Sequence, residues 1–191
     1  HNVFKNPEQV MENIIGVTSY LRKVLTDMGE NPDKRTLNVI KTKDGTGCFK
    51  DKNGCYWRVL VFIDDAVSLE LPESENDFYQ SAVAFGEFQK MLDKYPAETL
   101  HETIPNFHNT PVRFETFLKA VERDASGRAK NVAEEIEFVK RRCEFMSILE
   151  DSYAEGVLPK RVTHNDTKLN NVMLDKDTRK PVCVVDLDTI M

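Results

Sequence analysis

The chain lacks the features that mark several large classes of protein. Its longest uninterrupted apolar run, residues 59–63, is far shorter than a membrane-spanning helix requires. Acidic residues outnumber basic ones, 32 to 26, and the resulting net charge of −6 excludes a general nucleic-acid binder. There is no internal repeat and no low-complexity tract. Since 40% of the residues are hydrophobic, the chain can bury a core, and disorder of the whole chain is excluded as well.

The cysteines carry no recognisable pattern. None of the four belongs to a CxxC pair or has histidines at zinc spacing, and they do not form a dense disulfide framework: Cys48, Cys55, Cys143 and Cys183. The first residues show no basic segment followed by an apolar one, as a secretion signal would. We therefore expect reduced thiols in a cytoplasmic protein that associates with neither membranes nor nucleic acids.

The first part of the sequence predicts one helix followed by antiparallel strands. Residues 6–28 have helical spacing of apolar side chains, with Asn6 as the cap and Gly29 as the stop. Two strand-like segments follow, at 36–42 and 56–63. Between them lie a possible short strand and two turn dipeptides: residues 48–50, Asp44-Gly45 and Asn53-Gly54.

The middle of the sequence predicts a helical block. One apolar stripe begins at residue 77 and includes Phe78, Ala82, Phe85 and Gln89. A second helix starts at Thr110-Pro111. A third runs over 131–152 and begins with a capping-box pattern of Asn131 and Glu134. Short strands are then expected at three places near the end: residues 161–164, 172–174 and 182–185.

Polar residues interrupt these last strands in an unusual pattern. The pattern reads His164-x-Asp166-x-x-x-x-Asn171, and Asp186 then directly follows an apolar run. A carboxylate at the end of a buried strand is costly unless a cation or hydrogen bonds compensate it. Oxygen atoms of Asp and Asn are ligands that Mg²⁺ takes, together with waters and phosphates. Asp186-Leu187-Asp188 by itself is equally compatible with a solvated acidic loop.

Together the two segments resemble the catalytic loop and metal-binding aspartate of the protein-kinase-like fold. The resemblance is closest to the aminoglycoside phosphotransferase and choline kinase branch. Within it, the N-acetylhexosamine 1-kinases are the most similar subfamily, through residues 104–114, 163–175 and 184–189. The resemblance implies an α+β fold. A partial nucleotide-binding lobe would span residues 1–64, and a partial, mainly helical catalytic and acceptor lobe residues 65–191.

The resemblance also implies a role for each motif residue. Asp166 would be the catalytic base, and Lys168 would place a cation against the transferred phosphate. Asn171 and Asp186 would hold Mg²⁺. Asp188 would be either a second metal ligand or a hydrogen-bond acceptor that contacts the ligands without touching the metal. His164 is interpreted as a residue that orients the loop by hydrogen bonding, and Asn170 has no role beyond capping a turn.

The remaining binding residues are expected on the same basis. The hinge between the lobes would meet the adenine of ATP through Phe62, Ile63, Asp64 and Asp65. On the first helix, Glu8 and Glu12 are candidates to pair with a phosphate-binding lysine, although a solvated helix face explains them equally well. The acceptor pocket would draw on Phe107, His108 and Arg113, and for His108 a structural role is the competing interpretation.

The sequence departs from the resemblance at both ends. No phosphate-covering loop or strand-borne lysine precedes the first helix, and the rest of the helical lobe does not follow Met191. We therefore expect a fragment of a longer enzyme, with weak nucleotide binding and little turnover by itself. The expected function is ATP- and Mg²⁺-dependent phosphorylation of the anomeric hydroxyl of an N-acetylhexosamine. The alternatives are a kinase for aminoglycosides or for choline-type amino alcohols, and an inactive kinase-like binding domain.

Overall fold

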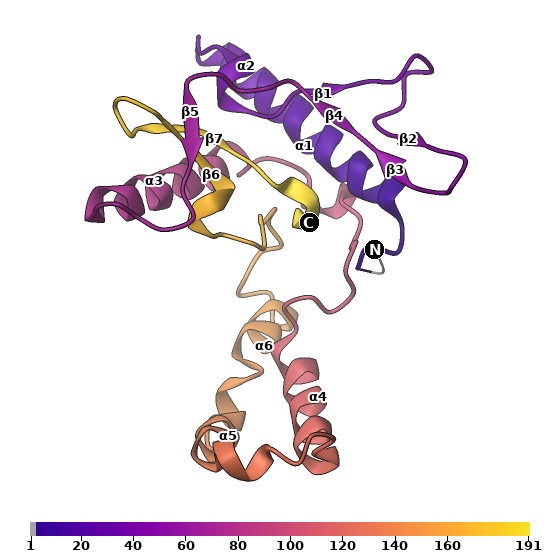
Figure 1. Ribbon diagram of the computed structural model, residues 1–191, viewed down its shortest axis with the longest axis vertical. Helices are drawn as coiled ribbons and strands as arrows, with labels where there is room; N and C mark the ends of the chain where they lie inside the picture. Colours follow the sequence, from indigo (N-terminus) through magenta and orange to yellow (C-terminus); the bar gives the residue numbers. More distant parts are fainter. Residues whose placement is uncertain (1–2) are drawn as a thin grey trace. The chain divides into compact units, whose positions relative to one another are not determined.

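The computed structural model describes residues 3–191, which form two compact units. The first unit joins His1–Ile104 to Arg161–Met191, and the second is Pro105–Lys160. The first unit contains the two halves of the predicted catalytic motif. Figure 1 shows the course of the chain through both units.

The first unit is built around a long helix, α1 (Pro7–Asp27), which confirms the helix predicted from the sequence. The Asn6 side chain accepts hydrogen bonds from the backbone N–H groups of Glu8 and Gln9 at 3.1 and 3.3 Å, and proline occupies the first helical position. One face of α1 is buried in the core, including Val17 and Leu25. Gly29 ends the helix with a φ of 77°, which a residue without a Cβ adopts readily.

Four very short strands follow α1 and a short helix, α2 (Pro32–Arg35), that the sequence did not predict. They are β1 (Val39–Ile40), β2 (Phe49–Lys50), β3 (Tyr56–Trp57) and β4 (Val59–Leu60). β2 pairs with β3 and β1 pairs with β4, both antiparallel. The predicted strand at 56–63 is thus interrupted at Arg58, because the chain changes its pairing partner there.

A three-stranded antiparallel sheet forms the other side of this unit. Its order is β5 (Ala66–Ser68), β6 (Val172–Asp175) and β7 (Pro181–Val184), with β6 in the centre. The sequence predicted β6 and β7 but not β5, whose pairing with β6 joins residues far apart in the chain. The strand predicted at 161–164 does not form. Only Thr163 in that segment makes a ladder-like pair of backbone hydrogen bonds, with Met191.

Helix α3 (Glu75–Met91) packs against β7 and β6 of this sheet. In Figure 1 it lies beside these strands. The predicted apolar stripe is right only in part. Phe85 packs against the core, as do Leu92 and Tyr95 farther along the same stripe, but Phe78 is exposed. The buried positions within the helix are Asp77, Ser81, Ala84 and Phe88. The physical reason is the start of the helix. The buried Asp77 carboxylate accepts the N–H groups of Glu73 and Ser74, which turns its face of the helix inward.

The second unit holds the remaining helices, α4 (Thr110–Arg123), α5 (Ala133–Lys140) and α6 (Ile148–Ala154). The single helix predicted for 131–152 is wrong, and Asn131 is not its cap. Instead α5 ends after Lys140, where the Arg142 guanidinium donates to the carbonyl of Phe138 at 2.8 Å. A cation that satisfies a carbonyl of the last turn favours ending the helix at that point.

Five single 3₁₀ turns complete the description. They are η1 (Ala97–Thr99), η2 (Ala129–Val132), η3 (Cys143–Phe145), η4 (Leu169–Asn171) and η5 (Leu187–Thr189). Two of them, η4 and η5, contain predicted site residues. Across residues 3–191 no helix has the length and apolarity needed to cross a membrane.

Candidate active site

The β6–β7 hairpin brings the two halves of the sequence motif together. The catalytic loop runs into β6 through η4, and the Asp186 segment leaves β7 and enters η5. A backbone hydrogen bond of 2.9 Å from the N–H of Val185 to the carbonyl of Asn171 joins the two segments directly. The metal-binding residues expected from the resemblance therefore come from adjacent backbone positions.

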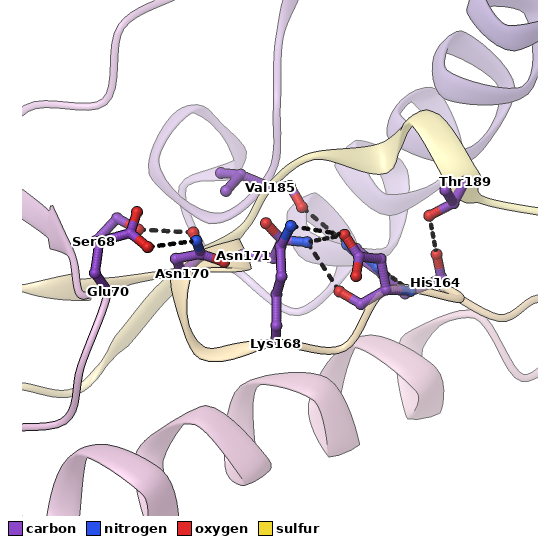
Figure 2. Close-up of polar contacts among 9 residues, drawn as sticks. Ser68, Glu70, His164, Lys168, Asn170, Asn171, Val185 and Thr189 are labelled. Carbon is purple, nitrogen blue, oxygen red and sulfur yellow. Dashed lines mark hydrogen bonds and ion pairs between the residues drawn. The ribbon is translucent and has the colours of Figure 1, made fainter. Parts of the chain in front are cut away.

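Asp166 lies at the centre of the loop and is held through one oxygen. Its Oδ2 accepts a hydrogen bond from Asn171 Nδ2 at 3.0 Å and forms an ion pair with Lys168 Nζ at 3.0 Å. Figure 2 labels Lys168 and Asn171 and marks their contacts with dashed lines. The hydrogen bond from Lys168 is the main reason why the pKa of Asp166 is lowered, and it raises the pKa of Lys168 in turn. Asp166 is thus ionised at neutral pH, with Oδ1 left to meet a ligand.

His164 makes hydrogen bonds to both segments of the site through its imidazole ring. Its side chain is buried, with Nε2 2.8 Å from the carbonyl oxygen of Val185, and Nδ1 accepts from the N–H of Asp166 at 3.3 Å. This pair of bonds requires a neutral ring protonated on Nε2. Burial likewise lowers the pKa of His164. The imidazole thus contacts both segments, Asp166 in the loop and Val185 after β7, and Thr189 Oγ1 also donates to the backbone carbonyl of His164 at 2.6 Å (Figure 2).

Two residues of the site adopt a left-handed backbone conformation. Asn165 has a φ of 66° and Asp186 a φ of 59°, values that Asn and Asp tolerate better than most residues. The Asn165 amide donates to the carbonyl of Thr189 at 2.9 Å and accepts from Thr163 Oγ1 at 2.8 Å. These bonds offset the cost of the turn that directs Asp166 away from the core.

The predicted metal ligands supply suitable donor atoms. Asn171 is buried and turns its amide nitrogen to Asp166, which leaves its carbonyl oxygen as a donor, and Asp186 contributes an exposed carboxylate. The carboxylate of Asp188 forms an ion pair with Arg58. In residues 3–191 no three His, Cys, Asp or Glu side chains gather into a metal cluster. An amide and two carboxylates nevertheless fit Mg²⁺, which keeps several waters and usually shares substrate phosphates.

An apolar cavity of about 290 Å³ adjoins these ligands. Two of the four residues predicted to meet the nucleotide, Phe62 and Ile63, line it together with Asp186. The other two do not. Asp64 is exposed, and the Asp65 carboxylate forms an ion pair with Lys176 at 2.6 Å in the turn after β6, which lowers the pKa of Asp65.

The candidate glutamates of α1 have other partners in this structure. Glu8 accepts a hydrogen bond from the hydroxyl of Tyr56 at 3.3 Å. Glu12 lies 2.6 Å from Nε2 of His101. The predicted pairing of one of these glutamates with a phosphate-binding lysine stays a prediction.

The three residues predicted to line the acceptor pocket belong to the second unit. The rings of Phe107 and His108 lie 4.4 Å apart, and Arg113 is exposed on α4. Asn109 caps this helix by accepting from the N–H of Val112 at 3.0 Å. A part for these side chains in acceptor binding stays a prediction.

Sequence reasoning missed two contacts of the site. Arg58 pairs with Asp188, and the signal was available, since Arg58 is the one charged residue inside the apolar segment 56–63. Asn170, which had no expected role, donates to Glu70 at 3.0 Å, and its carbonyl accepts from Ser68 Oγ at 2.6 Å (Figure 2). No local pattern signals this second contact, because β5 and its continuation were not predicted.

A family comparison agrees with this arrangement. Residues 42–191 match the model of the phosphotransferase enzyme family, APH, and the chain belongs to that family. The α+β fold, with helices and small antiparallel sheets, is compatible with a partial protein-kinase-like fold in a member of it. Enzymes of this family are phosphotransferases of small molecules and generally use ATP and Mg²⁺.

Proposed function

We propose that this chain is the catalytic part of an ATP- and Mg²⁺-dependent kinase that phosphorylates the anomeric hydroxyl of an N-acetylhexosamine. One observation carries the catalytic half of the proposal: Asp166 is ionised and oriented by Lys168 and Asn171 beside the predicted metal ligands. A phosphotransferase relies mainly on positioning and charge stabilisation, and these contacts supply both.

The free oxygen of Asp166 would accept a hydrogen bond from the acceptor hydroxyl and take its proton as the acceptor oxygen bonds to the γ-phosphorus of ATP and the bond from that phosphorus to ADP breaks. Lys168 would neutralise charge on the transferred phosphoryl group. Asn171 and Asp186 would hold Mg²⁺, with Asp188 next to them. When bound, the ion neutralises negative charge on the nucleotide phosphates. The apolar cavity beside Phe62 and Ile63 is the proposed place for the adenine.

The choice of acceptor rests on the sequence resemblance to N-acetylhexosamine 1-kinases over residues 104–114, 163–175 and 184–189. The side chains proposed to contact the sugar are Phe107, His108 and Arg113. Aminoglycosides and choline-type amino alcohols are the competing acceptors, because members of the wider branch act on them. A cytoplasmic location belongs to this proposal, since soluble metabolites are its substrates.

The test is ADP release with ATP, Mg²⁺ and a panel of acceptors. The panel holds N-acetylglucosamine, N-acetylgalactosamine, choline and an aminoglycoside, assayed with this chain and with any longer protein that contains it. Turnover on the acetylated sugars alone supports the proposal. Turnover on choline or the aminoglycoside would mean that the acceptor is that compound and not an N-acetylhexosamine. Nucleotide binding without any turnover by the longer protein favours a binding domain.

Substitution of the base gives the matched test. In a longer protein that contains this chain, Asp166→Asn is expected to lower turnover by about 10³-fold or more, with nucleotide affinity nearly unchanged, because the amide cannot take the proton. Asp93→Asn is the control, since Asp93 also forms an ion pair on the surface, at 2.5 Å from Arg161. Equal turnover of the Asp166→Asn variant and the wild type would refute the assignment of the base.

A further inference from the structure

One arginine lies where two neighbouring cavities of the first unit meet the predicted metal ligands. Arg58 lines the cavity of about 290 Å³ together with Asp186, and it lines a second cavity of about 630 Å³ together with Asp188. Among the described residues it is the only Lys, Arg or His that lines either cavity. The rest of the smaller cavity wall is apolar. Among the residues that line these two cavities, Arg58 is therefore the one strong donor for a bound anion.

The position of Arg58 in the fold explains why its side chain lines both cavities. It lies between β3 and β4, where the chain stops pairing with β2 and begins to pair with β1. Its guanidinium forms an ion pair with the Asp188 carboxylate, and the two side chains are 32% and 27% exposed. Because water reaches both groups, the pair is weak and its partners can be exchanged for other ions.

Two ions would compete for the members of this pair when a metal nucleotide binds. Mg²⁺ is a hard cation and would compete for the Asp188 carboxylate. A guanidinium released from a carboxylate binds phosphate well, because its planar fork matches two phosphate oxygens at once. Without the metal, the negative charges of Asp186 and Asp188 instead repel a polyanionic ligand.

We infer that Arg58 is a phosphate-binding residue of the nucleotide site, held by Asp188 in the metal-free protein and released to the nucleotide phosphates when Mg²⁺ takes the Asp188 carboxylate. The inference rests on the proposed function, because it requires a metal nucleotide in the cavity. Its consequence is that the metal and the nucleotide bind cooperatively: each raises the affinity of the site for the other.

The experiment measures nucleotide binding to the full 191-residue chain by calorimetry, with ATP in excess EDTA and ATP in excess Mg²⁺. Trp57, the one tryptophan, precedes Arg58 and gives a second, fluorescence readout. Arg58→Gln is expected to weaken binding of the Mg²⁺ complex on the order of tenfold, the effect of losing one charge-assisted hydrogen bond. Arg58→Lys keeps the charge but loses the planar fork of the guanidinium. Its affinity for the Mg²⁺ complex is therefore expected to lie between that of the wild type and that of Arg58→Gln.

The matched control is Arg22→Gln. Arg22 is also 32% exposed and pairs with a single carboxylate, Asp33, at 2.7 Å, but it lines neither cavity. Its substitution is expected to leave the affinity for the Mg²⁺ complex unchanged. Circular dichroism and thermal melting of both variants establish that they are folded.

A double-mutant cycle separates release of Arg58 from simple loss of negative charge. Asp188→Asn is expected to strengthen binding of metal-free ATP several-fold, because it frees the guanidinium. In the Arg58→Gln/Asp188→Asn double variant this gain is expected to disappear. A gain that persists in the double variant, or an Arg58→Gln variant with wild-type affinity for the Mg²⁺ complex, overturns the inference alone. Failure of the wild type to bind the Mg²⁺ complex overturns the proposed function together with it.

Discussion

The imidazole of His164 has one protonation state that satisfies both of its neighbours. Nε2 must donate to the carbonyl of Val185, and Nδ1 must accept from the N–H of Asp166. A second proton on Nδ1 would face that N–H and break the bond that holds the backbone at Asp166. Burial adds to this preference by lowering the pKa of His164 from its usual 6.5.

This single residue predicts a pH dependence of stability. Since the folded pKa lies below 6.5, the unfolded state binds the proton first as the pH falls. The contribution of neutral His164 is therefore fully present above 6.5 and is lost as the pH falls through the folded pKa. Denaturant midpoints at a pH of about 7.5 and about 5.5 are expected to differ more in the wild type than in His164→Gln. Equal differences in the two proteins would contradict this origin.

Asp166 does not interfere with that measurement. Its pKa is lowered from 3.8 by the bond from Lys168, so its own contribution is lost only at more acidic pH. For the same reason, the Asp166 carboxylate is not expected to titrate between pH about 5 and about 8.

The cysteines give a second prediction at the residue scale. Cys183 is buried in β7, and burial raises the pKa of its thiol to about 12. Cys55 and Cys143 are exposed. Alkylation of the native protein by iodoacetamide, followed by peptide mass mapping, is expected to label Cys55 and Cys143 and to leave Cys183 unmodified, because the thiolate is the reactive form. Native labelling of Cys183 at a similar rate would show that β7 opens readily.

Among the elements, α1 is tied to two other segments through one buried polar side chain. Asn13 donates to the carbonyl of His101 at 2.8 Å and to the carbonyl of Ile190 at 3.0 Å, and it accepts from the N–H of His101 at 2.9 Å. Ile190 directly follows η5, which contains Asp188. The helix therefore helps to hold the segment that carries two predicted metal ligands.

Removal of this amide is expected to be costly. Asn13→Ala leaves one buried and two partly buried backbone groups without this partner, and we expect a loss of about 3 kcal/mol in the free energy of unfolding, measured with urea. Ser19→Ala is the control, an exposed position of the same helix, with an expected change within about 0.5 kcal/mol. A similar small change in both variants would mean that water replaces the lost hydrogen bonds.

For the whole molecule, the two units differ in how much apolar surface they bury. The apolar core lies in the first unit, with Val17, Leu25, Leu174 and Ile190 almost fully buried. In Pro105–Lys160 the only apolar side chain classed as buried is Ile136, whereas Phe145, Leu149 and several others are exposed. Few buried contacts imply a low free energy of local opening.

Amide hydrogen exchange tests this difference. Exchange measured by mass spectrometry is expected to be at least about tenfold faster in α4, α5 and α6 than in α1 and α3. Peptides from exposed helix ends are compared only with one another, since ends fray in any helix. Equal protection of the two groups of helices would show that the exposed apolar side chains of the second unit are covered in solution.

The elements that the sequence predicted correctly are those specified by local chemistry. Asn6, Pro7 and Gly29 determined the ends of α1, and residues 172–174 and 182–185 predicted β6 and β7 around a turn. β5 could not be predicted in this way. Its three residues form a strand only because β6, more than a hundred residues later, supplies the hydrogen-bond partners. The inner face of α3 was missed in part for a similar reason, since Asp77 turns inward to satisfy two N–H groups.

By itself the sequence determined which residues are the candidates for the chemistry. The spacing of Asp166, Asn171 and Asp186 around two apolar strands depends on local order, and the family match over residues 42–191 agrees with the class of reaction it implies. Tertiary structure alone decided what each charge faces. Arg58 and Asp188 are 130 positions apart, and only the meeting of the β3–β4 junction with η5 pairs them. Ion pairs depend on distance in space, which the order of residues along a chain does not specify.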